Sequence, residues 1–100
     1  MDAMKKAQEF TSVAKDLQEQ LKNTEIEASV RDGQVTVVMT AQQVPVSVTV
    51  SDELVAMGSD EVSKAVTEGV IAAHGKSSEY MKEKMGSLTK DFGIPQPPMQ

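Results

Sequence analysis

The 100-residue chain contains no cysteine, no tryptophan, one histidine and only three aromatic residues. The absence of cysteine excludes disulfide bonds and thiolate metal sites. With His74 as the only imidazole, neither a Ser–His relay nor a Cys–His pair has its partners. No glycine-rich phosphate loop follows any predicted strand. We therefore expect no enzyme activity, no metal site and no cofactor.

The chain also lacks a long apolar segment and an excess of positive charge. No apolar run approaches the roughly 18 residues that a membrane span needs. The first residues, MDAMKK, lack the apolar stretch of a secretory signal. The 10 basic residues are outnumbered by 15 acidic ones, which gives a formal net charge of −5. We expect no membrane insertion and no broad basic surface, although a local basic patch is compatible with this balance.

Large apolar residues are scarce as well. Leu, Ile, Val and Phe together make up 22 of the 100 residues, which is close to the composition of chains that stay disordered. A domain of this size must offset an ordering entropy of about 100–200 kcal/mol. A core built mainly from Val, Ala and Met is thin for that task. We therefore expect a second copy of the chain to supply the missing burial, in a homodimer.

The first part of the chain predicts an amphipathic helix over about residues 2–23. Its apolar positions recur at the three- and four-residue intervals of a single helix face, and the charged residues fall mostly off that stripe. The positions of the stripe are Ala3, Ala7, Phe10, Ala14, Leu17 and Leu21.

Residues 24–50 predict three antiparallel strands in a meander. Apolar and polar residues alternate through residues 24–32, and Asp32-Gly33 is a tight-turn signal. A second strand follows at residues 35–40, with Val35, Val37 and Met39 on its apolar face. Residues 41–43 predict the second turn. Pro45 places the third strand at an edge or a strand entry. One face of this strand carries Val44, Val46, Val48 and Val50.

A helical pattern returns after residue 50, first as a short turn at residues 51–54 and then as a helix over about residues 60–91. The stripe of this helix recurs at three- and four-residue intervals and consists of Val62, Val66, Val70, Ala73, Ser77, Met81, Met85, Leu88 and Phe92. An unbroken helix of that length would be roughly 48 Å long, whereas a compact domain of 100 residues has a radius of gyration of about 13 Å. The helix should therefore project beyond the sheet unless it breaks near Gly69 or Gly75. The fold class is α+β, with one domain over residues 1–93 and a proline-rich flexible tail over residues 94–100.

The projecting helix and the third strand both present apolar side chains that the chain itself cannot fully cover. We expect a partner protomer to cover them. The candidate positions of this dimer interface are Val44, Val46, Val48, Val50, Met81, Met85 and Leu88.

Basic residues are distributed unevenly. Residues 24–58 hold Arg31 against five acidic residues, whereas residues 76–90 hold four lysines against two. These lysines are compatible with an ordinary solvated helix face threaded by i,i+3 and i,i+4 pairs. In a dimer, however, two copies of a local basic patch could straddle phosphates.

The order of these segments resembles the YbaB/EbfC family of nucleoid-associated proteins. The resemblance is carried by MKKAQEF and LQEQL in the first helix, DGQVTVVMTAQQVPVSVTVSDEL in the sheet region, and YMKEKMGSL and FGIPQPP at the end. It implies a tweezer-like homodimer with helical arms, which binds DNA with little sequence preference and acts in nucleoid organisation or gene regulation. By position, the DNA-facing candidates that it implies are Lys5, Lys6, Lys15, Lys22, Lys76, Lys82, Lys84 and Lys90.

The resemblance leaves one alternative function and two locations open. The stretch VTEGVIAAHGKSSEYMKEKM is similar to the cyanobacterial and plastid branch of the family, whose plastid members are linked to protein targeting. The alternative is thus a protein-interaction adaptor that acts through its helical arms or its proline-rich tail. The resemblance implies a cytoplasmic, nucleoid-associated location, or a plastid stroma after removal of a transit peptide.

Overall fold

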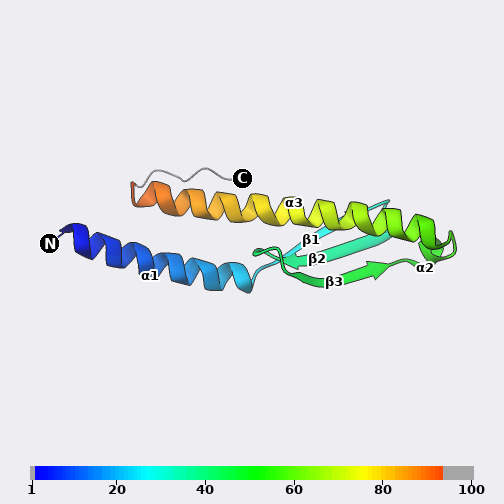
Figure 1. The fold of residues 1–100 in the computed structure, drawn as a ribbon, viewed down its shortest axis with the longest axis horizontal. Coiled ribbons are helices and arrows are strands. Elements are labelled where there is room, and N and C mark those ends of the chain that lie inside the picture. The colour runs from blue at the N-terminus through cyan, green and yellow to red at the C-terminus, as the bar shows by residue number, and fades with distance from the viewer. Residues whose placement is uncertain (1, 94–100) are drawn as a thin grey trace.

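The computed structural model describes residues 2–93, and the helices and strands follow the predicted order (Figure 1). The predicted tail at residues 94–100 lies outside the described residues. The elements are α1 (Asp2–Lys22), β1 (Glu25–Val30), β2 (Val35–Thr40), β3 (Pro45–Val50), α2 (Asp52–Val55) and α3 (Ser59–Asp91). The α+β class with one long N-terminal helix, a meander and a longer C-terminal helix is therefore confirmed.

The three strands form an antiparallel sheet in the order β1-β2-β3. In β2, the predicted inward face is confirmed, since Val35 and Val37 are fully buried and Met39 is 3% exposed. The turn between β1 and β2 contains the expected Gly33, and Arg31 and Asp32 before it also have positive φ angles of 54° and 55°. The structure thus contains the predicted meander.

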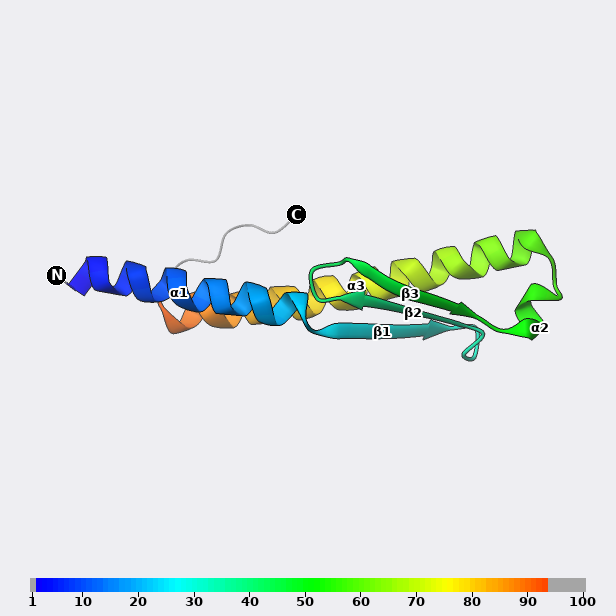
Figure 2. The same ribbon diagram turned by 90° about the horizontal axis from the view of Figure 1, so that it is seen from below.

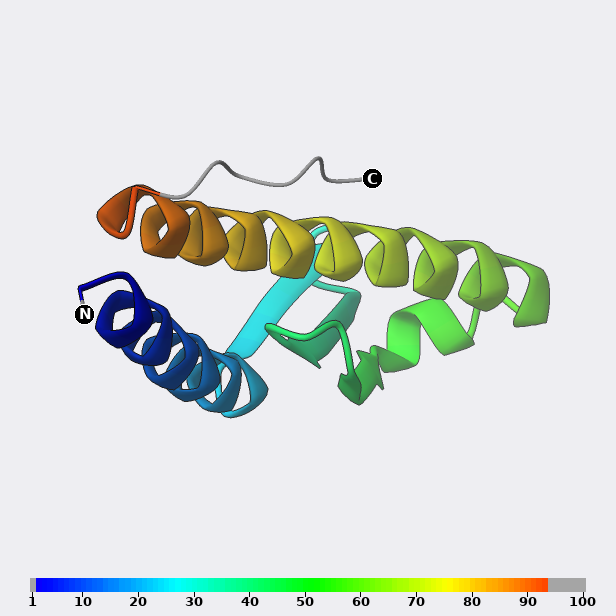
Figure 3. The ribbon, with the colours of Figure 1, turned by 60° about the vertical axis from the view of Figure 1, so that its left-hand side comes forward.

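α3 covers one face of the sheet and leaves the other face bare (Figure 3). The helix lies mainly over β1 and β2, and it meets them through a stripe of small buried residues. A Cβ atom added at Gly69 would lie 3.0 Å from Cγ1 of Val35 and 3.0 Å from Cγ2 of Val37. The small stripe consists of Ala65, Gly69, Ala73 and Ser77.

The sheet-facing stripe of α3 begins one position away from where the sequence pattern placed it. The pattern placed Val62, Val66 and Val70 on that face together with Ala73 and Ser77. Ala73 and Ser77 are buried there, but Val62 and Val66 are only half-buried at its margin, and Val70 is 38% exposed. The physical reason is the short distance between the axis of α3 and the sheet. A branched side chain at the position of Gly69 would hold the helix away from the sheet, so the small residues take the centre and the valines take the flank.

α3 continues without a break through both glycines that could have interrupted it, and it projects well past the sheet (Figures 1 and 2). The molecule measures 66 × 23 × 17 Å, and its Cα radius of gyration is 18.1 Å, well above the roughly 13 Å of a compact domain of this length. The expected projection is confirmed. We call the projecting part the arm, which consists of α1 and residues 78–91 of α3. No helix in residues 2–93 has the length and apolarity that a membrane span requires.

A cluster of charges fastens the β1–β2 turn to the start of α3. Arg31 donates from Nη1 to Glu61 at 2.9 Å, and from Nη2 and Nε to Glu68 at 2.7 and 3.2 Å. These hydrogen bonds hold the pKa values of both glutamates below their usual range and raise the pKa of the guanidinium. The only arginine of the chain is therefore engaged within the fold.

Matched substitutions at two glycines of α3 test the close seat of the helix. Alanine at Gly75 meets no atom within 4 Å, so Gly75→Ala should raise stability by about 1 kcal/mol through helix propensity. Gly69→Ala gains the same propensity but must displace two stiff valines, at a cost of about 1–3 kcal/mol. Urea titration should thus find Gly69→Ala less stable than Gly75→Ala. Equal gains would contradict the close seat.

The charge cluster predicts a stability difference that depends on pH. Because the folded-state pKa values of Glu61 and Glu68 are depressed, the stabilisation is present above their ordinary pKa and is lost as pH falls through the folded values. Thermal melts should show a higher melting temperature for the wild type than for Arg31→Met at pH 7. This gap in melting temperature should close below about pH 4. Lys64→Met is the control, since Lys64 lies 4.0 Å from Glu61 and is 69% exposed; its gap should be much smaller. A gap for Arg31→Met that is constant with pH would exclude the ionic origin.

Candidate nucleic-acid interface

All eight lysines proposed as DNA contacts have exposed side chains. Four of them lie on α1 and four on α3. Within the part of the chain that the structure describes, none of the eight forms a salt bridge. Their ammonium groups are thus free of carboxylate partners in one copy of the chain, which is a requirement for binding an external anion.

Two of the eight lysines have partners of another kind. The Nζ atom of Lys76 donates a hydrogen bond of 2.6 Å to the backbone carbonyl of Glu27 in the edge strand β1. The Nζ atom of Lys84 lies 5.4 Å from the ring centroid of Tyr80, in a cation–π contact. Lys76 is therefore attached to the sheet rather than to the arm, whereas Lys84 is held along the surface of α3.

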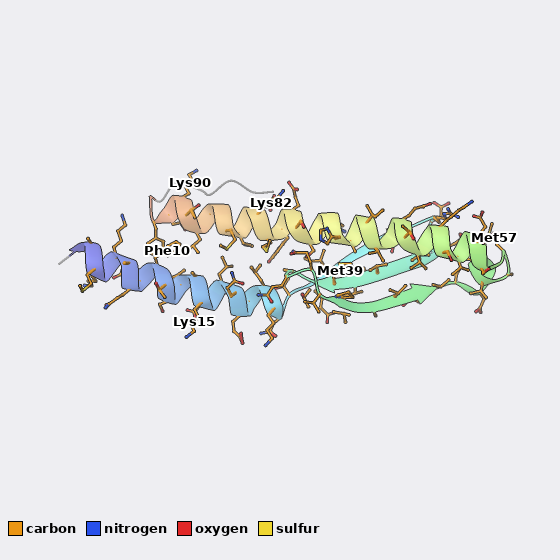
Figure 4. The ribbon with its side chains drawn as sticks, in the orientation of Figure 1. Phe10, Lys15, Met39, Met57, Lys82 and Lys90 are labelled. Carbon is orange, nitrogen blue, oxygen red and sulfur yellow. The ribbon has the colours of Figure 1, made fainter. Side chains whose placement is uncertain are left out.

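The lysines of the arm do not form a single patch. Figure 4 shows Lys15 pointing away from α3 on one side of the arm, and Lys82 and Lys90 pointing away from α1 on the other side. The resemblance placed these residues only by element, and the structure places them on opposite sides. One copy of the arm therefore presents basic groups on two surfaces.

Acidic residues accompany some of these lysines and not others. Lys84 lines a groove between α1 and α3 together with Asp16 and Asp91. The depression beside Lys15 on α1 contains no acidic residue; its lining is Met4, Ala7, Gln8, Thr11, Ser12 and Lys15. Lys84 therefore shares its groove with two carboxylates, whereas the depression beside Lys15 is lined by none.

Charge is separated along the length of the molecule. Residues 24–75 contain eight acidic and two basic residues, a net charge of −6, whereas the rest of the chain contains seven acidic and eight basic residues, a net charge of +1. The sheet end is thus strongly acidic, and the arm is close to neutral with exposed lysines. The electrostatic repulsion of an anionic ligand is therefore stronger at the sheet end than at the arm.

The two helices of the arm converge toward their outer ends (Figure 1). The rings of Phe10 and Phe92 meet edge to face, with centroids 5.3 Å apart and an interplanar angle of 87°. Leu88, one of the expected interface residues, is only 6% exposed, so its side chain is already covered within one chain. Met81 and Met85 are half-buried. The outer arm therefore closes on itself more than the sequence pattern predicted.

Strand β3 shows the opposite behaviour, because its apolar side chains remain uncovered. Val44 just before the strand is 53% exposed, Val46 is 50% exposed and Val48 is 45% exposed. Val50 is half-buried against the core. β3 is an edge strand and α3 reaches it only marginally. Val44, Val46 and Val48, three of the four valines named as interface candidates, thus form an apolar strip with no cover in one copy of the chain.

The polar contacts where the sheet meets the arm were not predicted from the sequence. The β2–β3 turn, residues 41–43, lies between the end of α1 and the middle of α3 (Figure 1). The turn was predicted in place, but nothing in the sequence pattern indicated that the side chains of Gln42 and Gln43 bond to the two helices. The one available signal in the sequence was that this turn contains neither glycine nor asparagine. In the structure, its third residue, Gln43, has φ 63°, a conformation for which turns usually use those residues.

Three comparisons place the chain among known proteins. The model of the YbaB/EbfC DNA-binding family matches residues 1–92. The chain is 40% identical to nucleoid-associated protein PCC7424_2224 of Gloeothece citriformis and 38% identical to nucleoid-associated protein slr1847 of Synechocystis; each alignment covers 94% of this chain and 82% of the relative. It also resembles the crystal structure of the uncharacterized protein HP0035 from Helicobacter pylori, with TM-score 0.61 and 18% identity over 85% of this chain and 86% of that one. This last likeness supports the fold alone.

Proposed function

The chain belongs to the YbaB/EbfC DNA-binding family, and from this premise we propose that it acts as a dimeric nucleoid-associated protein whose arm lysines bind DNA phosphates with little sequence preference. The observation that carries the proposal is the charge separation. Exposed lysines without carboxylate partners lie along the arm, whereas the sheet end carries a net charge of −6. The arm is therefore the end of the described chain that a polyanion would approach against less repulsion.

Phosphate contact rather than base readout follows from the residue types. The commonest specific base contact is a bidentate arginine on guanine, and the only arginine of this chain is engaged by Glu61 and Glu68. Lysine ammonium groups act as point charges and suit phosphate oxygens of any sequence. Binding of this kind fixes the position of the protein on the duplex without selecting a sequence.

A second copy of the chain fits the apolar strip of β3. The chain exposes 6907 Å², whereas a compact monomer of this mass exposes about 5,500 Å². Contiguous exposed valines on an edge strand favour pairing with another chain. The other edge is less open, because Lys76 occupies a carbonyl of β1. We therefore propose that the partner protomer docks on the β3 side and that the two arms project from a shared sheet region.

A pair of arms fits a role in nucleoid organisation or gene regulation, which agrees with the description of the named relatives as nucleoid-associated. A cytoplasmic, nucleoid-associated location is part of this proposal, and the plastid alternative stays a prediction. The adaptor alternative is less well supported. Leu88 is buried and the methionines of the arm's α3 segment are half-buried, so this segment offers little apolar surface to a protein partner. On α1, Met4 and Val13 are the large exposed apolar residues that such a partner would have to use.

Removing lysines from both sides of the arm tests the proposed contacts. The double variant Lys15→Gln, Lys82→Gln should bind duplex DNA at least about tenfold more weakly at low salt, and its salt dependence should be shallower, by about 0.9 in log–log slope for each phosphate that is no longer neutralised. Filter retention on duplexes of unrelated sequence, over a series of salt concentrations, measures both quantities. Lys64→Gln is the control, since Lys64 is an exposed lysine near the acidic sheet end. A slope equal to that of the wild type would place the contacts elsewhere.

A charge placed in the β3 strip tests the proposed interface. Val46→Glu should convert the dimer to a monomer, because pairing would bury an uncompensated carboxylate. The side chain is 50% exposed in one copy, so the fold of the chain itself should tolerate the change. Sedimentation equilibrium at micromolar concentration gives the mass. Val55→Glu, at a valine that is 57% exposed on α2, should stay dimeric. A wild-type mass of 10.8 kDa would refute the proposed dimer.

A further inference from the structure

The β2–β3 turn is the one place in the described chain where a single short segment bonds to both helices of the arm. We propose that residues 41–43 act as a pivot that sets the angle between α1 and α3, and so positions the arm lysines for DNA. Ala41 and Gln42 bond to α1 and the residues that follow it, and Gln43 bonds to α3. The consequence for DNA depends on the proposed function, whereas the pivot itself does not.

The attachment to α1 uses backbone and side-chain atoms. The backbone N–H of Ala41 donates to the carbonyl of Leu21 at 3.2 Å and to that of Thr24 at 2.9 Å. The Nε2 atom of Gln42 donates to the backbone carbonyl of Gln18 at 3.1 Å and to its side-chain Oε1 at 2.9 Å. Ala41 is fully buried and Leu21 is 1% exposed. The last turn of α1 is therefore fixed to the turn of the sheet.

The attachment to α3 is a buried polar contact. The Nε2 atom of Gln43 donates to Oγ of Ser77 at 3.0 Å, and Oγ of Ser77 donates to the carbonyl of Thr40 at 2.7 Å. The same amide of Gln43 donates to the carbonyl of Ala41 at 2.9 Å. Ser77 is fully buried, and it stands at the end of the small stripe, next to the arm. The turn is thus bonded to α3 at the point where the helix leaves the sheet.

The backbone of Gln43 indicates that this contact requires its side chain. Gln43 has φ 63°, a left-handed conformation that disfavours residues with a Cβ atom. Glycine is the common choice at this position of a three-residue hairpin loop. A glutamine here has a less favourable backbone, but it supplies an amide that reaches Ser77 and Ala41. The strained position is therefore associated with a specific side-chain function.

The turn lies at the inner end of the arm. A small rotation of α1 at the turn therefore displaces the outer end of the arm by several ångströms. Near the sheet, α1 and α3 stand apart with the turn between them, and they converge only at their outer ends (Figure 1). Since Lys5 and Lys6 lie about 25 Å from the inner end of α1 at 1.5 Å per residue, a rotation of about 10° at that end would move them by about 4 Å. Such a displacement is larger than the length of a hydrogen bond to a phosphate.

Distance measurements on the free protein test the pivot. The chain has no cysteine, so spin labels at Gln8→Cys on α1 and Ser87→Cys on α3 are unique. Labelled chains are mixed with an excess of unlabelled chains, so that pulsed electron resonance reports distances within one copy. Gln43→Gly relieves the backbone strain and removes the side-chain bonds. It should leave the melting temperature near that of the wild type and make the distance distribution at least about twofold broader.

Two further variants make the result specific. Asp32→Gly relieves the same kind of backbone strain, at a residue with φ 55° in the β1–β2 turn. It should leave the distribution of spin-label distances as narrow as in the wild type. Gln42→Ala removes only the side-chain bonds to α1 and should broaden the distribution as well. An unchanged distribution in both Gln43→Gly and Gln42→Ala would overturn the pivot, and would assign the arm geometry to contacts such as that of Phe10 with Phe92.

DNA binding separates the failure of the pivot from the failure of the proposed function. If the arm must be preorganised, Gln43→Gly should bind duplex DNA about 3–10-fold more weakly than Asp32→Gly. Wild-type protein that does not bind DNA would refute the proposed function, while the distance distributions would still test the pivot. Wild-type affinity in a Gln43→Gly variant with a broadened distribution would overturn the link between the arm angle and DNA.

Discussion

The close contact between α3 and the sheet is the constraint on which the rest of the structure depends. A stripe of small side chains lets the helix approach β2 until no Cβ atom fits easily at Gly69. A helix seated so closely lies over β1 and β2, and β3 stays largely outside its reach. The same helix runs on past the sheet and becomes half of the arm. The uncovered strand therefore results from this packing, and the arm is the continuation of the same long helix beyond the sheet.

Most of the fold could be predicted from the sequence, because it follows from local periodicity. The alternation through residues 24–50 identified the strands and the buried face of β2, and the three- and four-residue spacing identified both long helices. The centre of the α3 stripe was missed because an apolar pattern scores valine above glycine, whereas the sheet contact selects for the smallest side chain. How far two elements approach depends on both partners, and a pattern within one element does not contain that distance.

The candidate interface was less accessible to sequence reasoning. The sequence identified the lysines and their helices, but which side of the arm each one occupies depends on how α1 and α3 cross. That crossing involves the side chains of Gln42 and Gln43, and their bonds span 24 and 34 residues of sequence. The charge separation, by contrast, could be read directly, since it is a sum over long segments. It supports the proposal of a polyanionic ligand, which starts from the match to the YbaB/EbfC DNA-binding family.

The hydrogen bond from Lys76 to the carbonyl of Glu27 has a consequence for assembly. A sheet with two free edges can add chains at both sides and grow without limit, as fibres do. Here an ammonium group occupies a carbonyl at one margin of the sheet, whereas the valine-bearing margin on the opposite side carries uncovered apolar side chains. In the proposed dimer, two chains would join through the valine-bearing margin and leave only the β1 margins outside. Lys76 would then disfavour the addition of further chains at those margins, so that the assembly would stop at a closed pair.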